Sequence, residues 1–481
     1  MNTKMIKYIL ARMLGVEAVL LLIPAVVGLI YGEKCWIWFI VTALILSLIF
    51  LIGGRKAPEK TRIYGKEGMV IVAMAWILWS FFGGLPFVFD GCIPSLVDAF
   101  FETVSGFTTT GSTILNDVEA LPQCMLFWRS FTHWIGGMGV LIFVMVLTNL
   151  DKNSSMNLIR AEVPGPEKDK LMPTAMASAR INYAMYFVLT AIETVLLMAG
   201  GMNLFDSLVH AFGTAGTGGF SNYGASIGHF QSAYIEYVIA IFMILFGVNF
   251  GLYFLMILKE FKVAFKNEEL RAYLIIIAVT TGLITINILP QCKGLEEAFR
   301  FALFNVATVM TTTGYGTTDF VLWPMFSQCI LLALMFIGAC ASSTGGGMKV
   351  SRILIMVKEM GREVKQLAHP KSVNVIRING KKVERDVLHS LHVYLISYVV
   401  IMAGSTLIVA LDNFDFATTF TAIIATMNNI GPGIGAVGPT GNFADFSILS
   451  KLVMCFDMLA GRLEIFPFLM LFTVTAWNKK F

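Results

Sequence analysis

The segment Phe107-Thr-Thr-Thr-Gly111-Ser lies between long apolar stretches and decides the fold of this 481-residue chain. Three more short polar segments of the same kind follow it, with the sequences GTGGFS at 216–221, MTTTGYG at 310–316 and MNNIGPG at 427–433. Their glycines, Gly111, Gly219, Gly314 and Gly431, are 108, 95 and 117 residues apart. This spacing is about that of a two-helix membrane hairpin with its loops, so the sequence predicts a four-fold internal repeat.

A glycine-centred, threonine-lined segment inside a membrane protein is typical of a cation selectivity filter. Backbone carbonyl groups there replace the water around the ion, and glycine reaches the positive φ angles that turn successive carbonyls toward one axis. Close helix packing through small residues is the alternative, but it does not explain why every glycine follows a short polar stretch. The predicted ion-binding residues are Thr109, Thr110, Gly111, Thr217, Gly218, Gly219, Thr312, Thr313, Gly314, Asn429, Ile430 and Gly431.

The composition is that of a polytopic membrane protein. Apolar residues make up 57% of the chain, charged residues 14%, and the mean hydropathy is +0.75. These values lie far outside the range of soluble globular proteins. Since about 20 apolar residues cross a bilayer as a helix, we expect ten spans, at about 13–31, 35–53, 68–89, 128–150, 179–201, 233–258, 272–290, 323–348, 390–411 and 447–477.

Lysine and arginine residues set the expected orientation, because loops rich in these residues stay on the cytoplasmic side. Of the 35 such residues, 29 lie in the N-terminus, in the segments 55–66, 152–180, 259–271 and 349–385, and in the C-terminus. An even number of spans with both termini in the cytoplasm agrees with that bias. The net charge of +4 is therefore a topology signal and does not indicate nucleic-acid binding.

A short amphipathic stretch precedes each polar glycine segment. At roughly a dozen residues these stretches cannot cross a bilayer, so we expect re-entrant pore helices that end at the filter, at 96–107, 204–215, 298–310 and 416–427. The expected fold class is an all-α polytopic membrane protein in which four pseudo-equivalent helix–pore-helix–filter–helix repeats surround one ion pore. The expected units are an N-terminal helix pair at 1–66 and repeats at 67–175, 176–268, 269–387 and 388–481.

Two features interrupt the apolar spans. The stretch Ala341–Met348 contains Gly345, Gly346 and Gly347, each of which costs about 1 kcal/mol relative to alanine in a helix. A simple helix end at the cytoplasmic surface would also account for it. Arg462 follows eleven mostly apolar residues of the last span, so it should face a cavity or a partner. An ion pair with Glu464 is the structural alternative.

Several other residues have a chemistry that needs an explanation. Glu102 and His210 each lie nine residues before a filter glycine, and Asn305 and Ala422 occupy the same place in the other repeats. We expect polar groups there to anchor the filter from behind, and a proton relay is the sharper alternative. The GxGxxG match at 433–438 lacks a preceding strand and a following helix, so no nucleotide site is expected in this chain.

The seven cysteines show no metal-binding spacing. Cys92, Cys124 and Cys292 fall in predicted outer loops, where pairing is possible. Cys329, Cys340 and Cys455 are expected to be thiols packed in the membrane.

These motifs resemble those of the TrkH-type pore subunits in the Trk/Ktr/HKT superfamily of potassium transporters. The matching stretches are FETVSGFTTTGS at 101–112, GGFS at 218–221, TTTGY at 311–315, NNIGPG at 428–433 and GRLE at 461–464. The two extra N-terminal helices and the fourth segment favour the TrkH type over the shorter Ktr type. The fourth segment departs from the Thr-Thr-x-Gly pattern of the first and third, so four-fold symmetry should be only approximate.

The resemblance implies a potassium uptake function and no enzyme activity. Glycine at all four filter positions goes with potassium selectivity in the family. The loop with Gly345, Gly346 and Gly347 would gate the pore beneath the filter, and Arg462 would raise the barrier to cations there. It further implies a bacterial inner-membrane location, a homodimer of pores, and a cytosolic TrkA-type regulatory subunit that binds NAD or ATP.

Two other functions stay open at this point. A sodium-coupled or sodium-permeable transporter would have the same architecture. A multipass membrane enzyme would use Glu102, His210 and Asp457 as acid–base groups, but these residues fall on different repeats.

Overall fold

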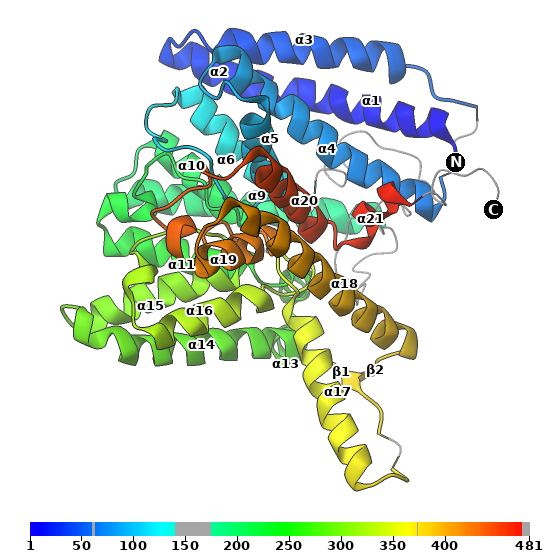
Figure 1. Ribbon diagram of the computed structural model, residues 1–481, viewed down its shortest axis with the longest axis vertical. Coiled ribbons are helices and arrows are strands. Elements are labelled where there is room, and N and C mark those ends of the chain that lie inside the picture. The colour runs from blue at the N-terminus through cyan, green and yellow to red at the C-terminus, as the bar shows by residue number, and fades with distance from the viewer. Residues whose placement is uncertain (60–62, 140–174, 373, 474–481) are drawn as a thin grey trace.

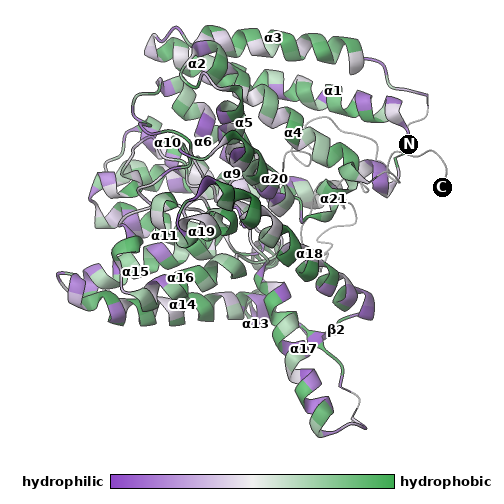
Figure 2. Cartoon of the chain, in the orientation of Figure 1, coloured by the Kyte–Doolittle hydropathy of each residue, from purple (hydrophilic) through white to green (hydrophobic). Residues whose placement is uncertain are grey.

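The computed structural model is mostly helical and describes residues 1–59, 63–139, 175–372 and 374–473 (Figure 1). Within these described residues six helices are long and apolar enough to cross a membrane, and a bent pair could form a seventh span. Large apolar side chains such as Leu44, Leu48 and Ile286 are exposed on the outer helices, which are mostly green in Figure 2. Exposed apolar surface of this extent needs lipid around it. The chain is therefore an all-α polytopic membrane protein.

A helical hairpin at the N-terminus lies beside the rest of the molecule, at the top of Figure 1. It contains α1 (Thr3–Leu20), α2 (Leu22–Tyr31) and α3 (Trp36–Gly53). Helix α1 packs on α3 and on α4, and α2 packs on α6. The first two predicted spans are confirmed, although the first helix begins ten residues earlier than expected.

The remaining helices follow one another in four similar groups. The first comprises α4 (Gly65–Asp90), α5 (Leu96–Phe107) and α6 (Gln123–Gly137), and the second α9 (Ala175–Ala199), α10 (Leu204–Gly216), α11 (Ala233–Phe246) and α12 (Phe250–Ile257). The third comprises α14 (Glu268–Ile288), α15 (Leu295–Met310), α16 (Met325–Ile337) and α17 (Val350–Ala368), after the linking α13 (Phe261–Lys266). The fourth comprises α18 (Arg385–Val409), α19 (Phe416–Met427), α20 (Ile448–Arg462) and α21 (Phe466–Leu469).

Short elements connect these helices. The 3₁₀ turns are η1 (Ser226–Phe230), η2 (Leu289–Gln291), η3 (Phe320–Leu322), η4 (Ala410–Asp412), η5 (Gly435–Val437) and η6 (Met470–Phe472). A small antiparallel hairpin pairs β1 (Arg377–Ile378) with β2 (Lys381–Lys382), with Arg377 opposite Lys382. Together with α17 and the start of α18, the hairpin extends away from the other helices at the bottom of Figure 1.

Four short helices occupy the positions expected for pore helices. Helices α5 and α19 have the predicted bounds, α10 is one residue longer, and α15 begins three residues earlier. Three of them start at a side-chain cap, because Ser95, Asn203 and Asp415 each accept a hydrogen bond from the backbone three residues on. Such caps satisfy backbone donors that would otherwise be unpaired at the start of a helix.

The structure corrects the expected span at 233–258, which is broken. Helices α11 and α12 meet at an angle of 91° across residues 247–249. The Asn249 side chain accepts from Gly251 N (2.8 Å) and so starts a new helix. Two backbone bonds from a distant segment hold the break open, from Cys340 N to Gly247 O (3.1 Å) and from Phe250 N to Ser342 O (3.2 Å).

Two other predicted spans also end early. In the third group α16 ends at Ile337, because Gly338 has a φ of 75°, so the interruption starts before the predicted Ala341–Met348. In the fourth group α20 ends at Arg462, and Glu464 and Ile465 have φ of 54° and 68°. Arg462 is therefore at a helix end rather than at the centre of a span. Residues 140–150 of the span expected at 128–150, and 474–477 of the last span, lie outside the described residues.

The cysteine predictions also need correction. Cys124 does not lie in a loop but is the second residue of α6. Cys329 is exposed on α16, whereas Cys340 and Cys455 are buried as expected.

The break between α11 and α12 generates a test of stability. A methyl group on Gly247 would overlap the hydroxyl of Tyr273, which donates to Ile244 O (3.1 Å). We expect Gly247→Ala to lower the free energy of unfolding by about 1–3 kcal/mol, as overpacked sites do. Thermal unfolding in detergent measures this effect.

Gly282→Ala is the matched control, because the added methyl group on α14 would meet no atom within 4 Å apart from its neighbours in the chain and the nearby backbone of its own helix. That substitution should leave the stability unchanged or raise it by up to about 1 kcal/mol. A second change, Tyr273→Phe, should recover part of the loss in Gly247→Ala. Equal stability of the two alanine variants would contradict this account of the break.

Candidate functional site

The four polar glycine segments share one backbone conformation. In each segment one residue is left-handed, with φ of 55° at Thr109, 56° at Thr217, 58° at Thr312 and 55° at Asn429. Two residues later the glycine also has a positive φ, of 84° at Gly111, 77° at Gly219, 85° at Gly314 and 97° at Gly431. A non-glycine residue rarely takes this conformation, so its four-fold recurrence indicates a common structural role.

The same hydrogen bond ends each of the four short helices. The residue before the glycine donates its N–H to the carbonyl five positions earlier, and this bond measures 2.8 Å in every segment. The pairs are Thr110 to Ser105, Gly218 to Gly213, Thr313 to Thr308, and Ile430 to Ala425. The departure of the fourth segment from threonine to asparagine therefore leaves its backbone geometry unchanged.

The four glycines form a closed ring. A methyl group added to Gly111 would overlap the carbonyl oxygen of Gly218, one on Gly219 that of Thr313, and one on Gly314 that of Ile430. A methyl group added to Gly431 would lie 2.7 Å from Thr110 O. Thr110 belongs to the first segment, so the four contacts close into a cycle. Each glycine thus touches the carbonyl group that precedes the glycine of the next segment. The structure brings all twelve predicted filter residues into these four adjoining turns.

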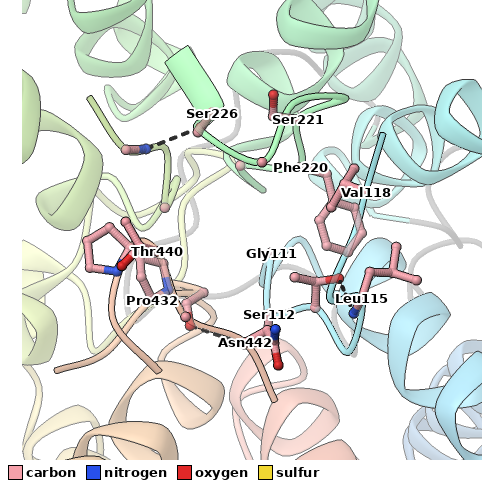
Figure 3. A pocket seen from close by; sticks show the side chains of 18 of the residues that line it. Gly111, Ser112, Leu115, Val118, Phe220, Ser221, Ser226, Pro432, Thr440 and Asn442 are labelled. Atoms are coloured by element: carbon pink, nitrogen blue, oxygen red, sulfur yellow. Dashed lines mark hydrogen bonds between the residues drawn. The ribbon is translucent and has the colours of Figure 1, made fainter. Parts of the chain in front are cut away.

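A polar pocket opens on one side of the ring. Its walls include all four glycines and Arg129 of α6, and the other lining residues come from the segments after the glycines, among them Ser112, Phe220, Ser221, Pro432 and Asn442. Figure 3 shows side chains from several repeats placed around an open centre. Tyr223 also lines this pocket, and its hydroxyl donates to Asp206 (3.0 Å). Burial, together with the Asp206 charge, raises the pKa of Tyr223 to about 12, so this group stays neutral.

Polar side chains at three of the four equivalent pore-helix positions contact residues that follow the glycine segments. Glu102 accepts from the Thr113 hydroxyl (2.9 Å) and from Ile114 N (3.0 Å), both just after the first filter. His210 Nε2 contacts Ser221 Oγ (2.9 Å) after the second filter. Asn305 donates to Thr318 Oγ1 (3.3 Å) after the third. The apolar Ala422 has no such role in the fourth repeat.

Two residues of α6 that the sequence reading did not select join the first and second filters. Arg129 forms a fully buried ion pair with Glu102 (2.7 Å), donates to Ser221 O (3.3 Å), and lies 4.1 Å from the centre of the Phe220 ring. His133 Nδ1 contacts Gly106 O (2.7 Å), and His133 Nε2 accepts from Phe220 N (3.2 Å). The sequence signal for these two residues was a charged residue followed one helical turn later by a histidine, within an apolar helix.

The α19 helix carries an ionised cap at its start. The Thr418 hydroxyl and backbone N–H donate to Asp415 (the N–H at 2.9 Å) and hold the pKa of Asp415 below its usual range. A negative charge at this end and the helix dipole both favour positive charge near the ring, where the helix ends.

The glycine-rich loop contacts the opposite side of the ring from the pocket, at the turns where the short helices end. Gly346 N donates to the Thr312 hydroxyl (2.6 Å), and Gly347 N donates to Asn428 O (3.1 Å). A methyl group on Gly345 would lie 2.8 Å from Thr311 O. The loop therefore lies directly against the third and fourth filter segments, and its glycines allow this approach because they have no side chain.

Arg462 connects this loop to another helix. Its guanidinium donates to Thr344 O (2.8 Å) in the loop, and to Gly136 O (2.6 Å) and Gly137 O (2.8 Å) at the end of α6. Glu464, which the sequence reading considered as its partner, pairs with Arg352 at 2.5 Å.

Buried charges fix both ends of the loop. Glu269 on α14 accepts from Ala341 N (2.7 Å) at the start of the loop and from Ser351 N (3.1 Å) after it. The ammonium group of the buried Lys349 donates to the carbonyl of Gly345. Lys349 and Arg462 thus place two positive charges on carbonyl groups of the same loop.

The residues considered for an enzyme do not form one site. Glu102 pairs with Arg129, His210 bonds Ser221, and Asp457 accepts from Ser405 (2.7 Å) between α18 and α20. Glu102 and His210 are linked only indirectly, through Arg129 and Ser221, and Asp457 has a separate partner.

Comparisons with known proteins show which family the chain resembles in sequence and in overall structure. The Trk system potassium uptake protein TrkH of Escherichia coli (strain K12) is 35% identical over 485 residues, which cover 98% of this chain and 99% of that protein. TrkG of the same strain is 33% identical, covering 95% of this chain and 94% of that protein. The crystal structure of the potassium transporter TrkH from Vibrio parahaemolyticus matches with a TM-score of 0.88 and 32% identity, over 99% of this chain and 100% of that one. Because residues 39–480 also match the TrkH family, described as cation transport proteins, the chain belongs to this family of transporters and not to an enzyme family.

Proposed function

We propose that this chain takes up potassium ions through the ring formed by Gly111, Gly219, Gly314 and Gly431. The observation that carries the proposal is the closed cycle of contacts between each glycine and the carbonyl group of the next segment. Carbonyl oxygens from four segments around one axis can replace the water of a dehydrated cation. The relatives compared above are named as potassium uptake proteins, which supports potassium as the transported ion.

The position of the charges supports a cation pathway. The cap Asp415 and the dipoles of α5, α10, α15 and α19 favour positive charge at the ring where these helices end. A sodium-permeable or sodium-coupled transporter is the second candidate, because the same carbonyl chemistry binds sodium. Glycine in all four segments supports potassium.

Access to the pathway would be controlled by the loop at Gly345, Gly346 and Gly347. The loop lies against the third and fourth filter segments, and Arg462 holds it to α6. An ion leaving the ring would meet the loop and the charge of Arg462 in succession. We propose that the loop is the gate and that Arg462 both holds it closed and raises the electrostatic barrier.

The chain would lie in a bacterial cytoplasmic membrane with both termini in the cytoplasm, as a homodimer. Its four repeats would follow the divisions at 67–175, 176–268, 269–387 and 388–481, after the N-terminal pair at 1–66. The protruding α17 and the β1–β2 hairpin would then face the cytoplasm, where a TrkA-type subunit that binds NAD or ATP would dock. The names of the relatives as parts of a Trk system support a partner of this kind.

The filter proposal can be tested by substitution at the ring. We expect Gly111→Ser to lower selectivity for potassium over sodium on the order of tenfold, or about 1.4 kcal/mol. The reason is that its side chain would overlap Gly218 O and would strain a backbone with a φ of 84°. Reversal potentials in mixed potassium and sodium solutions give the selectivity.

Gly91→Ser is the matched control for backbone strain. Gly91 has the same φ of 84° at the end of α4, but an added side-chain carbon would meet no atom within 4 Å beyond its neighbours in the chain. Its selectivity should equal that of the unmodified chain. If equivalent substitutions at all four ring glycines left the selectivity unchanged, the filter assignment would be wrong.

The gate proposal concerns ion flux rather than selectivity. Deleting Gly345–Gly347 removes the physical obstacle, and Arg462→Ala removes a charge together with three hydrogen bonds to carbonyl groups. Two unit charges 4 Å apart interact by about 4 kcal/mol at an effective dielectric constant near 20, enough to limit throughput. We therefore expect each variant to raise potassium flux into proteoliposomes.

Arg462→Lys separates the two roles of Arg462, because it keeps the charge but loses the planar set of donors. Its flux should fall between those of the unmodified chain and Arg462→Ala. Arg271→Ala, at an exposed arginine on α14, should have no effect. Unaltered flux in both the deletion and Arg462→Ala, with normal folding, would place the gate elsewhere.

The partner proposal rests on the exposed cationic hairpin. Arg377, Lys381 and Lys382 are exposed, and the hairpin is fixed to α17 by a bond from Lys358 Nζ to Arg377 O (2.7 Å). Reversing these three charges should weaken binding of an acidic nucleotide-binding regulator, and binding to the unmodified chain should decline as salt rises. Pull-down from native membranes at several salt concentrations measures both effects.

Charge reversal at Lys259, Lys262 and Lys266 is the control, since it makes the same change in net charge at exposed positions around α13. Binding should persist in that variant. Recovery of no nucleotide-binding subunit, together with flux that does not respond to NAD or ATP, would rule the partner out.

A further inference from the structure

Two cysteines far apart in the sequence lie in direct contact at one end of the helical bundle. Cys35 is the residue before α3, and Cys124 is the second residue of α6. Their sulfur atoms are 2.7 Å apart, and both side chains are buried. Of the seven cysteines, all of which the structure describes, these are the only two whose sulfur atoms touch.

The surroundings of the pair are preorganised. Glu33 accepts from Gln123 N (2.6 Å) and from Cys124 N (3.0 Å), so its carboxylate caps the start of α6. This cap fixes the segment before Cys35 against the helix that carries Cys124. Helix α2, which precedes Cys35, also packs along α6, which carries Cys124. This packing and the Glu33 cap together hold the two sulfur atoms close to each other.

Glu33, Cys35 and Cys124 together also have the residue types of a metal site, but the geometry argues against one. Two thiolates on one tetrahedral zinc ion lie about 3.8 Å apart, since each Zn–S bond is about 2.3 Å. The two sulfur atoms here are much closer than that. Both carboxylate oxygens of Glu33 are already hydrogen-bonded to backbone N–H groups of α6.

The pair lies on the same side of the membrane as the pocket above the ring. Residues 112–122 connect the first filter to α6, and Ser112, Leu115 and Val118 of this connection line the pocket. Cys35 is at the turn of the N-terminal hairpin, at the opposite end from the N-terminus. In the orientation that the lysine and arginine residues predict, this side is extracytoplasmic, where disulfides form and persist.

We propose that Cys35 and Cys124 form a disulfide that fastens the N-terminal hairpin to α6. The oxidant is a dithiol–disulfide exchange protein of the extracytoplasmic side. A thiolate of one cysteine attacks the oxidant's disulfide, and the second cysteine then displaces the oxidant from the mixed disulfide. One S–S bond forms here, one breaks in the oxidant, and two electrons and two protons pass to its two thiols. Because both sulfur atoms are buried in the folded chain, the exchange takes place during folding.

This crosslink would act on the part of α6 that supports the filter. Arg129 and His133, which hold the first and second filters, lie five and nine residues after Cys124 on the same helix. The crosslink joins this helix to the hairpin that lies outside the four repeats. It is therefore positioned to stabilise the outer end of α6, and it does not depend on which ion the ring conducts.

The test uses the full-length chain in membranes from cells with an oxidising extracytoplasmic compartment. The protein is denatured in SDS, so that burial no longer protects any thiol, and is treated with a polyethylene-glycol maleimide with or without a reductant. We expect every cysteine except Cys35 and Cys124 to react without reductant, and all seven to react after reduction. Peptide mapping of the non-reduced chain should yield the crosslinked pair.

Variants and chelation complete the design. Cys35→Ser should make Cys124 reactive without reductant, whereas Cys455→Ser, at a buried thiol with no cysteine partner in contact, should only remove one label in both conditions. Reductant should lower the unfolding temperature of the unmodified chain but not that of Cys35→Ser/Cys124→Ser. Labelling of both thiols in SDS without reductant would overturn the proposal. Labelling that requires EDTA but no reductant would overturn it in favour of a bound metal.

Discussion

Each ring glycine closely approaches the carbonyl group of the next segment, and this contact limits how the surrounding helices can be arranged. A methyl group at Gly111, Gly219 or Gly314 would overlap the neighbouring carbonyl oxygen, so no other residue permits this contact. The contacts close into a cycle only if the four short helices all end at one place. The longer helices, the caps of the short helices and the buried polar groups follow from that requirement, because each positions one quarter of the ring.

Holding carbonyl groups together in this way has an electrostatic cost, which the surrounding structure offsets. The carbonyls of adjacent segments repel one another, and a segment that is free to move would separate them. Arg129 opposes that movement by joining Glu102 to the chain after the second filter, within a fully buried ion pair. Removing one partner of such a pair leaves a buried charge without compensation, which is strongly destabilising. The first and second glycine segments are thus held by a buried ion pair, and Arg129 of this pair also lines the pocket.

The sequence predicts those features that depend on local chemistry. The bounds of α5 and α19 and the positions of the four glycine turns could be read directly, because turn glycines, cap residues and short apolar runs have local signatures. The broken spans could not be located in the same way. The break at Gly247 is held by a hydrogen bond from Cys340 N, about 90 residues later in the chain. The break at Gly338 is held by packing on Gly347, about 9 residues later. Both breaks therefore depend on contacts with another segment of the chain. A run of apolar residues has the same pattern in the sequence whether the helix continues through it or is bent by contact with another segment.

The glycine-rich loop and the ring share atoms, and this has a consequence for control. The Thr312 hydroxyl and the Asn428 carbonyl, which belong to the third and fourth filter turns, receive the bonds from Gly346 and Gly347. A loop that moved away as a gate would leave both groups without these partners, and a buried group that loses its hydrogen bond costs about 1–3 kcal/mol. Water that enters the opened space can replace the lost bonds. Under the proposed gate role, opening would be coupled to hydration of the inner end of the ring, so the same two contacts would favour a closed, dry state and would make an open state depend on water and ions in the pathway.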